Sequence, residues 1–290
     1  MTVHERSFKS YSGQLTPGWR RFLVLPFYAL PQIFKSRLFL SLYLISLVPS
    51  VVQTAIIYVR HNLRILEFFH LSPTDFPPMT GEFFLRFISV QGGFCFALVL
   101  VAGPPLISAD LINRGLPLYF ARPLGRGEYV LGKLSVLVIL LSPVTWIPQL
   151  LNYGLQGYLA ADGWFTGNLR IAGGILVGQV AWILTISLIA LAVSATVQRK
   201  TMARLLFFSI FFILSIFGSI IAEGMGLVWG QVLNIMGMAW LVNTGLLDVA
   251  LPTHAHFPPT WAGWLTLFVV CAVSIRLLAS KIQAYEVVRG

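Results

Sequence analysis

Charge is scarce in this sequence. Only 10% of its 290 residues are charged, against about 25% in an ordinary soluble domain. Hydrophobic residues make up 57% of the chain, and its mean hydropathy is +0.81. Because so few charged side chains cannot cover the surface of a soluble protein of this length, the composition predicts a membrane protein that crosses the bilayer several times.

Cysteine is also nearly absent. The two cysteines, Cys95 and Cys271, both fall inside long uncharged stretches, which argues against a disulfide framework or a cysteine-bound metal. His254 and His256 could bind a transition metal if the fold brought a third ligand close, but no carboxylate or cysteine stands at a useful spacing. We therefore predict no metal site.

Catalytic motifs are missing as well. No Gly-x-x-x-x-Gly-Lys-Ser/Thr loop occurs, so the chain cannot hold ATP phosphates in the usual way. There is no Gly-x-Ser-x-Gly elbow, no His-Glu-x-x-His motif and no acidic cluster, which leaves a membrane enzyme as the weaker alternative. A nucleic-acid groove would need a longer soluble segment than the sequence offers. We expect no catalytic residue and no bound cofactor in this chain.

Long uncharged stretches define the fold class. A hydrocarbon core about 30 Å thick needs about 20 helical residues to cross it, and these stretches lack the alternation of a β-barrel. We predict an all-helical integral membrane protein, with residues 1–290 forming one transmembrane domain. The predicted spans are 37–59, 85–107, 131–153, 172–196, 204–222 and 259–279.

Two further apolar stretches are too short or too polar to be clear spans. Residues 22–34, within the N-terminal segment 1–36, are interrupted by Pro26 and Pro31 and predict an elbow helix that lies in the membrane interface. Residues 224–247 are rich in glycine, asparagine and glutamine. We expect the segment 223–258 to form helices on, or dipping into, the outer face, with a seventh span at 224–247 as the alternative.

The distribution of basic residues predicts the orientation. With six spans and both termini inside, only Arg60, Arg64, Arg86 and Arg170 lie outside, and all other Lys and Arg residues lie in cytoplasmic segments, including the tail 280–290. A seventh span would move that basic tail outside. The net charge of +10 then needs no nucleic acid to explain it, because anionic lipid headgroups would meet most of the excess.

The densest charged segment is the loop 108–129, between the second and third spans. Ser108 is positioned to cap a short helix at 109–114, and Gly115 can end it in a left-handed conformation. Such a helix at the cytoplasmic mouth could be pushed by a soluble partner. The residues that we predict to contact this partner are Ser108, Asp110, Arg114, Arg122, Arg126 and Glu128. The alternative for each arginine is a positive-inside residue that only fixes the topology.

This loop resembles the coupling-helix region of type-2 ATP-binding-cassette (ABC) permeases, the six-span subunits of exporters. The matching residues are Ile107, Ser108, Asp110, Leu116, Leu118, Pro123, Gly125, Arg126, Tyr129, Gly132 and Lys133. Gly125 stands where many members carry serine, and Asn113 and Arg114 replace acidic residues common there.

The resemblance implies a bacterial inner-membrane complex. Two permease chains, most simply a homodimer, would bind two copies of an ABC ATPase subunit that holds ATP and Mg²⁺. The complex would export its cargo. The same loop would serve a subunit that transports nothing and passes ATP-driven motion to a periplasmic partner for assembly, maturation or motility.

Polar residues inside the predicted spans are few. Gln53, Gln91 and Gln179 fall near mid-depth, and Glu223 stands at the outer end of the fifth span. Such residues mark a possible substrate path, although hydrogen bonds between helices explain the glutamines equally well. Because no charge falls at the centre of a span, we expect a hydrophobic or amphipathic cargo.

Overall fold

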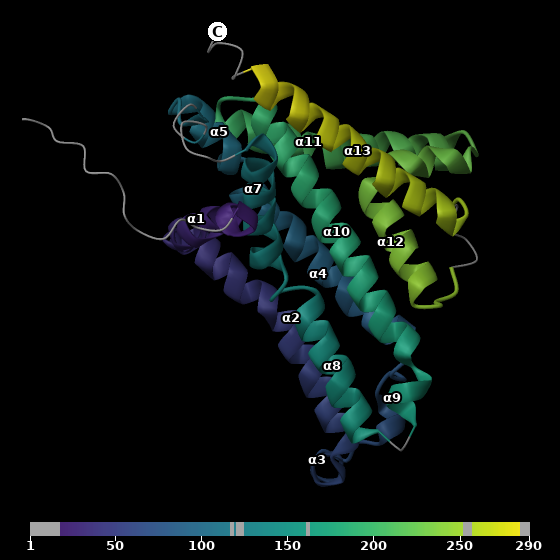
Figure 1. Ribbon diagram of the computed structural model, residues 1–290. Coiled ribbons are helices and arrows are strands. Elements are labelled where there is room, and N and C mark those ends of the chain that lie inside the picture. Colours follow the sequence, from purple (N-terminus) through teal and green to yellow (C-terminus); the bar gives the residue numbers. More distant parts are fainter. Residues whose placement is uncertain (1–17, 117–118, 120–124, 161–162, 252–256, 285–290) are drawn as a thin grey trace, which may run out of the picture.

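A computed structural model describes residues 18–116, 119, 125–160, 163–251 and 257–284, and within these ranges the chain is helical and contains no strand (Figure 1). Six helical segments are long and apolar enough to cross a membrane, so the chain is a multi-pass membrane protein. They are Arg37–His61, Gly81–Ile112, Arg126–Leu159, Leu169–Thr196, Lys200–Gly224 and Thr260–Ile282.

Ten described helical elements precede the long helix that begins at Leu169. They are η1 (Gly18–Leu23), α1 (Val24–Phe34), α2 (Arg37–His61), α3 (Leu63–Phe68), η2 (Pro73–Asp75), α4 (Gly81–Ala102), α5 (Pro105–Ile112), α7 (Arg126–Leu141), α8 (Trp146–Leu159) and α9 (Trp164–Gly167). The described elements from Leu169 onward are α10 (Leu169–Thr196), α11 (Lys200–Ser219), η3 (Ile220–Gly224), η4 (Val228–Leu233), α12 (Ile235–Leu246) and α13 (Thr260–Ala284).

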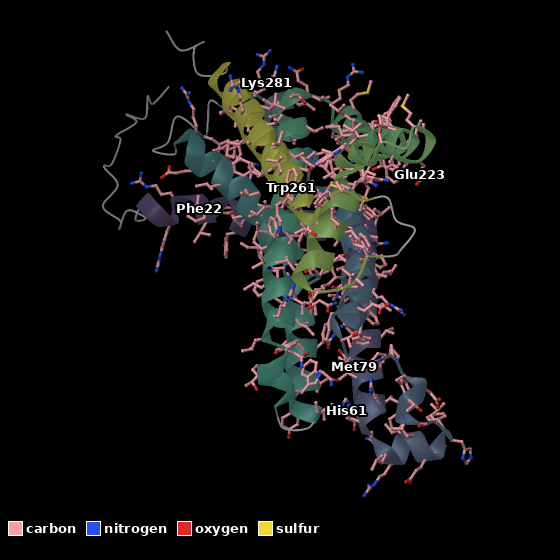
Figure 2. All side chains as sticks on the ribbon, turned by 90° about the vertical axis from the view of Figure 1, so that its right-hand side faces the viewer. Phe22, His61, Met79, Glu223, Trp261 and Lys281 are labelled. Carbon is pink, nitrogen blue, oxygen red and sulfur yellow. The ribbon has the colours of Figure 1, made fainter. Side chains whose placement is uncertain are left out.

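The two ends of the bundle are well separated. His61, at the end of α2, and Met79, just before α4, lie together at one end, whereas Lys281 of α13 lies at the other (Figure 2). Glu223, at the end of the fifth candidate span, lies closer to the Lys281 end than to the end with His61 and Met79 in the same view (Figure 2), although the sequence predicts it at the outer end. The predicted cytoplasmic side is the end that contains Lys281.

The predicted elbow segment 22–34 is helical, formed by the end of η1 and by α1. It packs against α7, where Gly132 makes the close approach possible. A Cβ atom at Gly132 would lie 2.4 Å from Leu25 Cδ1 and 2.8 Å from the carbonyl oxygen of Phe22. Ser36 then begins α2 by accepting a hydrogen bond from the amide of Phe39 at 3.4 Å.

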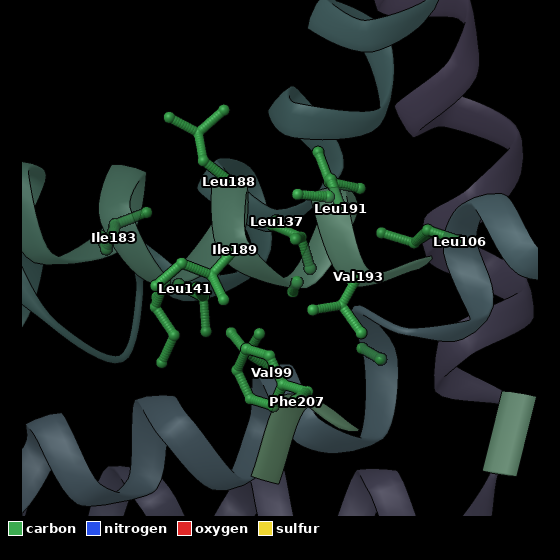
Figure 3. Close-up of a cluster of buried hydrophobic side chains, with 14 of the residues drawn as sticks. Val99, Leu106, Leu137, Leu141, Ile183, Leu188, Ile189, Leu191, Val193 and Phe207 are labelled. Carbon is green, nitrogen blue, oxygen red and sulfur yellow. The ribbon is translucent and has the colours of Figure 1, made fainter. Parts of the chain in front are cut away.

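Helix α10 forms the centre of the molecule. It packs against α4, α5, α7, α8, α11, α12 and α13, and 72% of its most apolar window is buried, against 22% for the windows of α2 and α11. Figure 3 shows aliphatic side chains of α10, such as Ile189, meeting Val99 of α4, Leu106 of α5, Leu141 of α7 and Phe207 of α11. Neighbouring helices cover every face of α10 around Ile189, and the side chains there are accordingly apolar on every face.

The third predicted span, 131–153, is interrupted. The chain leaves the helix at Ser142–Thr145, where Thr145 has φ −109° and ψ −98°, and this separates α7 from α8. Pro148 explains the position of the break, because it has no amide hydrogen to donate to the carbonyl of Val144 and its ring crowds that carbonyl.

Helix α12 is the main element of the predicted outer region. It has 12 residues, about 18 Å of helix, which is too short to cross a bilayer core of about 30 Å. It packs against α10 and α13, which also contact each other. Gly178 of α10 permits this contact, because a Cβ atom there would lie 2.2 Å from Asn243 Oδ1. Among the described residues, six segments qualify as spans and 224–247 does not provide a seventh.

The end of α12 is fastened to the start of α10. Arg170 donates hydrogen bonds to the carbonyl oxygens of Gly245, at 3.1 Å, and Leu246, at 3.3 Å, and it forms an exposed ion pair with Asp248 at 3.0 Å. A cation at a helix C-terminus satisfies carbonyl groups that have no partner within the helix.

A second interruption lies between α4 and α5, at Gly103 and Pro104. The hydroxyl of Ser194 on α10 accepts hydrogen bonds from the amides of Ile107, at 3.0 Å, and Ser108, at 2.9 Å, and donates one to the carbonyl of Pro104. One buried side chain of a neighbouring helix therefore replaces the backbone bonds that the interruption removes. Gly103 allows this proximity, because a Cβ atom there would lie 2.8 Å from Ala190 Cβ.

We expect Ser194→Ala to lower the free energy of unfolding by about 1–3 kcal/mol, because it leaves two buried amides without an acceptor. The matched control is Ser187→Ala in the same helix. Ser187 is fully buried and its hydroxyl has no hydrogen-bond partner among the described residues, so its removal should be neutral or slightly stabilising. Thermal unfolding of the detergent-purified variants measures both effects, and equal losses would contradict the assigned role of Ser194.

Candidate functional site

The predicted partner segment begins with α5, and its helix differs from the prediction. The helix starts at Pro105 rather than at Ala109, because proline is well suited to the first turn of a helix. Ser108 is therefore not a cap. It lies inside α5, is fully buried, and donates a hydrogen bond to the carbonyl of Pro104 at 2.7 Å.

Arg114, not Gly115, takes the left-handed conformation that ends α5. Its φ is 50°, the amide of Arg114 donates to the carbonyl of Leu111 at 3.2 Å, and the amide of Gly115 donates to the carbonyl of Asp110 at 2.7 Å. This pair of bonds is a Schellman motif, which usually places glycine where Arg114 stands. The side chains of Ile112, Asn113 and Arg114 are exposed, and we call these three residues the α5 turn.

Asp110 is bound within the chain. Its Oδ2 atom lies 2.7 Å from Lys133 Nζ of α7 and accepts a hydrogen bond from the Tyr129 hydroxyl at 2.7 Å. The side chains of Asp110 and Lys133 are only 18% and 8% exposed. Lys133 Nζ also lies 5.5 Å and 5.7 Å from the ring centroids of Tyr129 and Tyr119, within the range of a cation–π interaction.

This ion pair fixes α5 to the first turns of α7. Burial of two charges is unfavourable unless the geometry is close and further hydrogen bonds are present, and here the Tyr129 hydroxyl supplies such a bond. The Asp110 side chain thus contributes to the internal structure of the segment. It leaves the α5 turn as the outward-facing part of the helix.

The other predicted contact residues lie around the start of α7. Arg126 is the first residue of α7 and is partly exposed. Glu128, in the first turn, accepts a hydrogen bond from the amide of Gly125 at 2.7 Å, so its carboxylate caps the helix. Arg122 lies outside the described residues, as do His254 and His256.

A buried network of uncharged polar side chains connects α2, α4 and α8 in the opposite half of the bundle. Gln91 donates to the Ser50 hydroxyl and accepts from Gln149 at 2.9 Å. Asn152 donates to Gln53 Oε1 at 3.1 Å and accepts from the Thr54 hydroxyl at 2.6 Å. We call this set the polar ladder.

The polar ladder assigns Gln53 and Gln91 to contacts between helices. Both are fully buried, and their partners on α8 were missed by the sequence analysis. The signal was available: Gln149, Asn152 and Gln156 recur three and four residues apart, which places them on one face of a helix. The ladder retains unpaired buried atoms at Gln53 Nε2, Gln149 Oε1 and Gln156 Oε1.

The remaining two predicted path residues lie elsewhere. Gln179 of α10 lines a cavity of about 440 Å³ between α4, α10 and α12. Glu223 is exposed in η3 (Figure 2) and does not line that cavity. The four residues predicted for one path therefore occupy three separate places.

Removing one charge of the buried pair should destabilise the protein strongly. We expect Lys133→Met to lower the free energy of unfolding by about 3–5 kcal/mol, because it leaves the Asp110 carboxylate without its counter-charge. The double variant Asp110→Asn/Lys133→Met should recover a large part of this loss. Thermal unfolding of the single and double variants measures the coupling.

An exposed pair provides the control. Glu82 and Arg86 form an ion pair at 2.6 Å with side chains 58% and 69% exposed. Glu82→Gln should change the free energy of unfolding by less than about 1 kcal/mol. Additive losses at Asp110 and Lys133, of the size seen at Glu82, would contradict a structural role for the buried pair.

Comparison with known proteins identifies no family. No protein-family model matches the chain, and no curated protein matches it in sequence. The function therefore has to be argued from the residues and their geometry.

Proposed function

We propose that this chain is the membrane-spanning permease subunit of an ABC exporter, in which a separate subunit hydrolyses ATP. The observation that carries the proposal is the buried Asp110–Lys133 pair beneath the exposed α5 turn. It lies in the segment whose sequence resembles the coupling region of type-2 ABC permeases. A short exposed element that is firmly bonded to membrane spans is what a soluble motor subunit needs in order to move them.

The bonds around α5 define a path for force. A push on the α5 turn would reach α7 through Asp110 and Lys133, and α10 through the bonds of Ser194 to the amides of Ile107 and Ser108. Helix α5 also continues from α4. Three spans would therefore respond together, and α10 contacts most of the remaining helices.

The charge around the α5 turn indicates the chemistry of the partner surface. Arg199 and Lys200, exposed between α10 and α11, lie at the same end as Arg114, because α5 packs against both of these helices. In this proposal the three basic residues face the cytoplasm and meet acidic residues of the ATPase subunit. Complementary charge of this kind increases the rate and specificity of association.

The least buried spans provide surfaces for the second permease chain and for lipid. The exposed apolar side chains of α2 include Leu44 and Val48, and those of α11 include Phe212 and Ile216. In the proposed complex each of these faces is covered either by the second chain or by acyl chains. Apart from Lys133, which is paired with Asp110, the buried polar residues are uncharged amides and hydroxyls, which supports an uncharged amphipathic cargo.

The variant Arg114→Gly tests partner binding without loss of folding stability. Glycine adopts a positive φ without strain, so we expect the variant to be as stable as the wild type or more stable by up to about 1 kcal/mol. Loss of the exposed charge should weaken association with the ATPase subunit by roughly tenfold, the equivalent of about 1.4 kcal/mol. Co-purification of the tagged chain from its native membranes, followed by ATPase assay, measures this.

Arg86→Ala is the matched control, because Arg86 is an exposed arginine at the other end of the bundle. It should leave the bound ATPase activity unchanged. If an ATP-hydrolysing subunit accompanies neither the wild type nor the Arg86 variant, the permease proposal is wrong.

A further inference from the structure

The cavity beside Gln179 has the size and lining of a ligand site. Its volume of about 440 Å³ lies within the range of about 300–1,000 Å³ that is typical of small-molecule pockets. Three helices form its walls. Helix α4 contributes Ile88, Gly92 and Gly93, and α10 contributes Gln179 and Trp182. The third wall consists of α12 and the residue before it, and includes Asn234, Trp240 and Asn243. None of the described lining residues is charged.

Two residues that line this cavity carry a buried oxygen atom with no hydrogen-bond partner within the described part of the chain. The atoms are Gln179 Oε1 and Asn243 Oδ1, and their residues are 1% and 5% exposed. The indole Nε1 of Trp182, in a residue that is 5% exposed, is also unpaired. The neighbouring thiol of Cys95 is only a weak acceptor for it. Buried polar atoms are almost always paired, so this group of three needs an explanation.

Local packing holds these atoms in place. Asn243 donates its amide hydrogen to the carbonyl of Ala239 at 2.8 Å, which orients the side chain and leaves Oδ1 unused. Gly178 leaves the space that Asn243 occupies. Trp182 Nε1 lies 3.8 Å from the position of a Cβ atom at Gly92, so the indole edge faces a wall that has no side chain.

The depth of the cavity restricts the ligand further. Gln179 lies ten residues into α10, about 15 Å from its start, and Gly93 lies twelve residues into α4, about 18 Å from its start. Both positions are near the middle of a hydrocarbon core about 30 Å thick. A charged ligand would be strongly disfavoured there without a counter-charge.

We propose that this cavity binds an uncharged amphipathic molecule that carries hydroxyl groups. A hydroxyl can donate to Gln179 Oε1 or Asn243 Oδ1 and accept from Trp182 Nε1, so its chemistry matches all three atoms, which a small rotation of these side chains would bring to the cavity. The apolar part of the molecule contacts Ile88 and Trp240. This chemistry is found in the glycerol head of a neutral lipid and in a free polyol.

The site goes beyond the proposed function, because it is formed by one chain and needs neither ATP nor a partner subunit. Its occupant can be a cargo or a resident lipid. A failure to bind ligand leaves the proposed association with an ATPase untouched, and loss of that association leaves the ligand site untouched.

The test uses the full-length protein in nanodiscs and radiolabelled dioctanoylglycerol as the probe. Glycerol provides the soluble arm, and dioctanoyl phosphatidic acid provides the charged arm. We expect saturable binding of the diacylglycerol and at least tenfold weaker binding of the phosphatidic acid. Saturable binding of glycerol instead would support the same site and assign a soluble source to its ligand.

Three variants locate the binding. Gly93→Leu places a side chain where an added Cβ atom meets nothing within 4 Å, so it should fill the cavity without disturbing the fold and abolish binding. Gly173→Leu is the matched control, since Gly173 of α10 has the same free space and does not line the cavity. It should bind like the wild type.

Gln179→Leu removes the unpaired oxygen. It should weaken diacylglycerol binding about tenfold, the effect of one lost hydrogen bond, without lowering the melting temperature of the ligand-free protein. A lower melting temperature would mean that Gln179 serves packing, and the proposal would then fail. It would also fail if no probe bound to the wild type, or if binding persisted in Gly93→Leu.

Discussion

The position of α5 depends on one hydroxyl group, that of Ser194. A helix that is interrupted within a membrane loses backbone hydrogen bonds, and no water is available to replace them. Ser194 accepts from the amides of Ile107 and Ser108 and donates to the carbonyl of Pro104. With α5 held against α10 in this way, Asp110 reaches Lys133 and Tyr129, and the α5 turn faces outward.

The same shortage of water shapes the rest of the interior. In the polar ladder, each amide or hydroxyl finds a partner on another helix or on the backbone, and the spans α2, α4 and α8 are joined without any charge. Beside Gln179 the pairing is also incomplete, and the unpaired atoms belong to residues that line a cavity. The ladder joins the spans even though Gln53 Nε2 and Gln149 Oε1 within it also have no hydrogen-bond partner among the described residues.

The sequence predicted the number of spans, because each needs about 20 uncharged residues and little else competes with that signal. It also predicted that 224–247 would not span, from its content of glycine and amide side chains. Local rules failed at α5. Ser108 looked like a cap and Gly115 like a helix end, but the pair of prolines at 104 and 105 and the Ser194 contact determine where this helix starts and ends.

Residue contacts between helices were the least predictable feature. Gln53 and Gln91 were noticed as polar residues in spans, but their partners Gln149 and Asn152 lie across the bundle, and no spacing within one helix reveals such a contact. The external contact predicted for Asp110 stays a prediction, but its internal partners could not be foreseen for the same reason. A charge in a loop looks accessible until the fold shows the lysine of the next span beside it.

The break at Ser142–Thr145 divides one span into two halves that both pack on α10 but form different polar bonds. Helix α7 is bonded to α5 by the Asp110–Lys133 pair, whereas α8 is bonded to α2 and α4 by the polar ladder. Turn hydrogen bonds, such as that from the amide of Ile147 to the carbonyl of Ser142 at 3.3 Å, still join the two halves across the break, so one span connects the buried ion pair to the polar ladder.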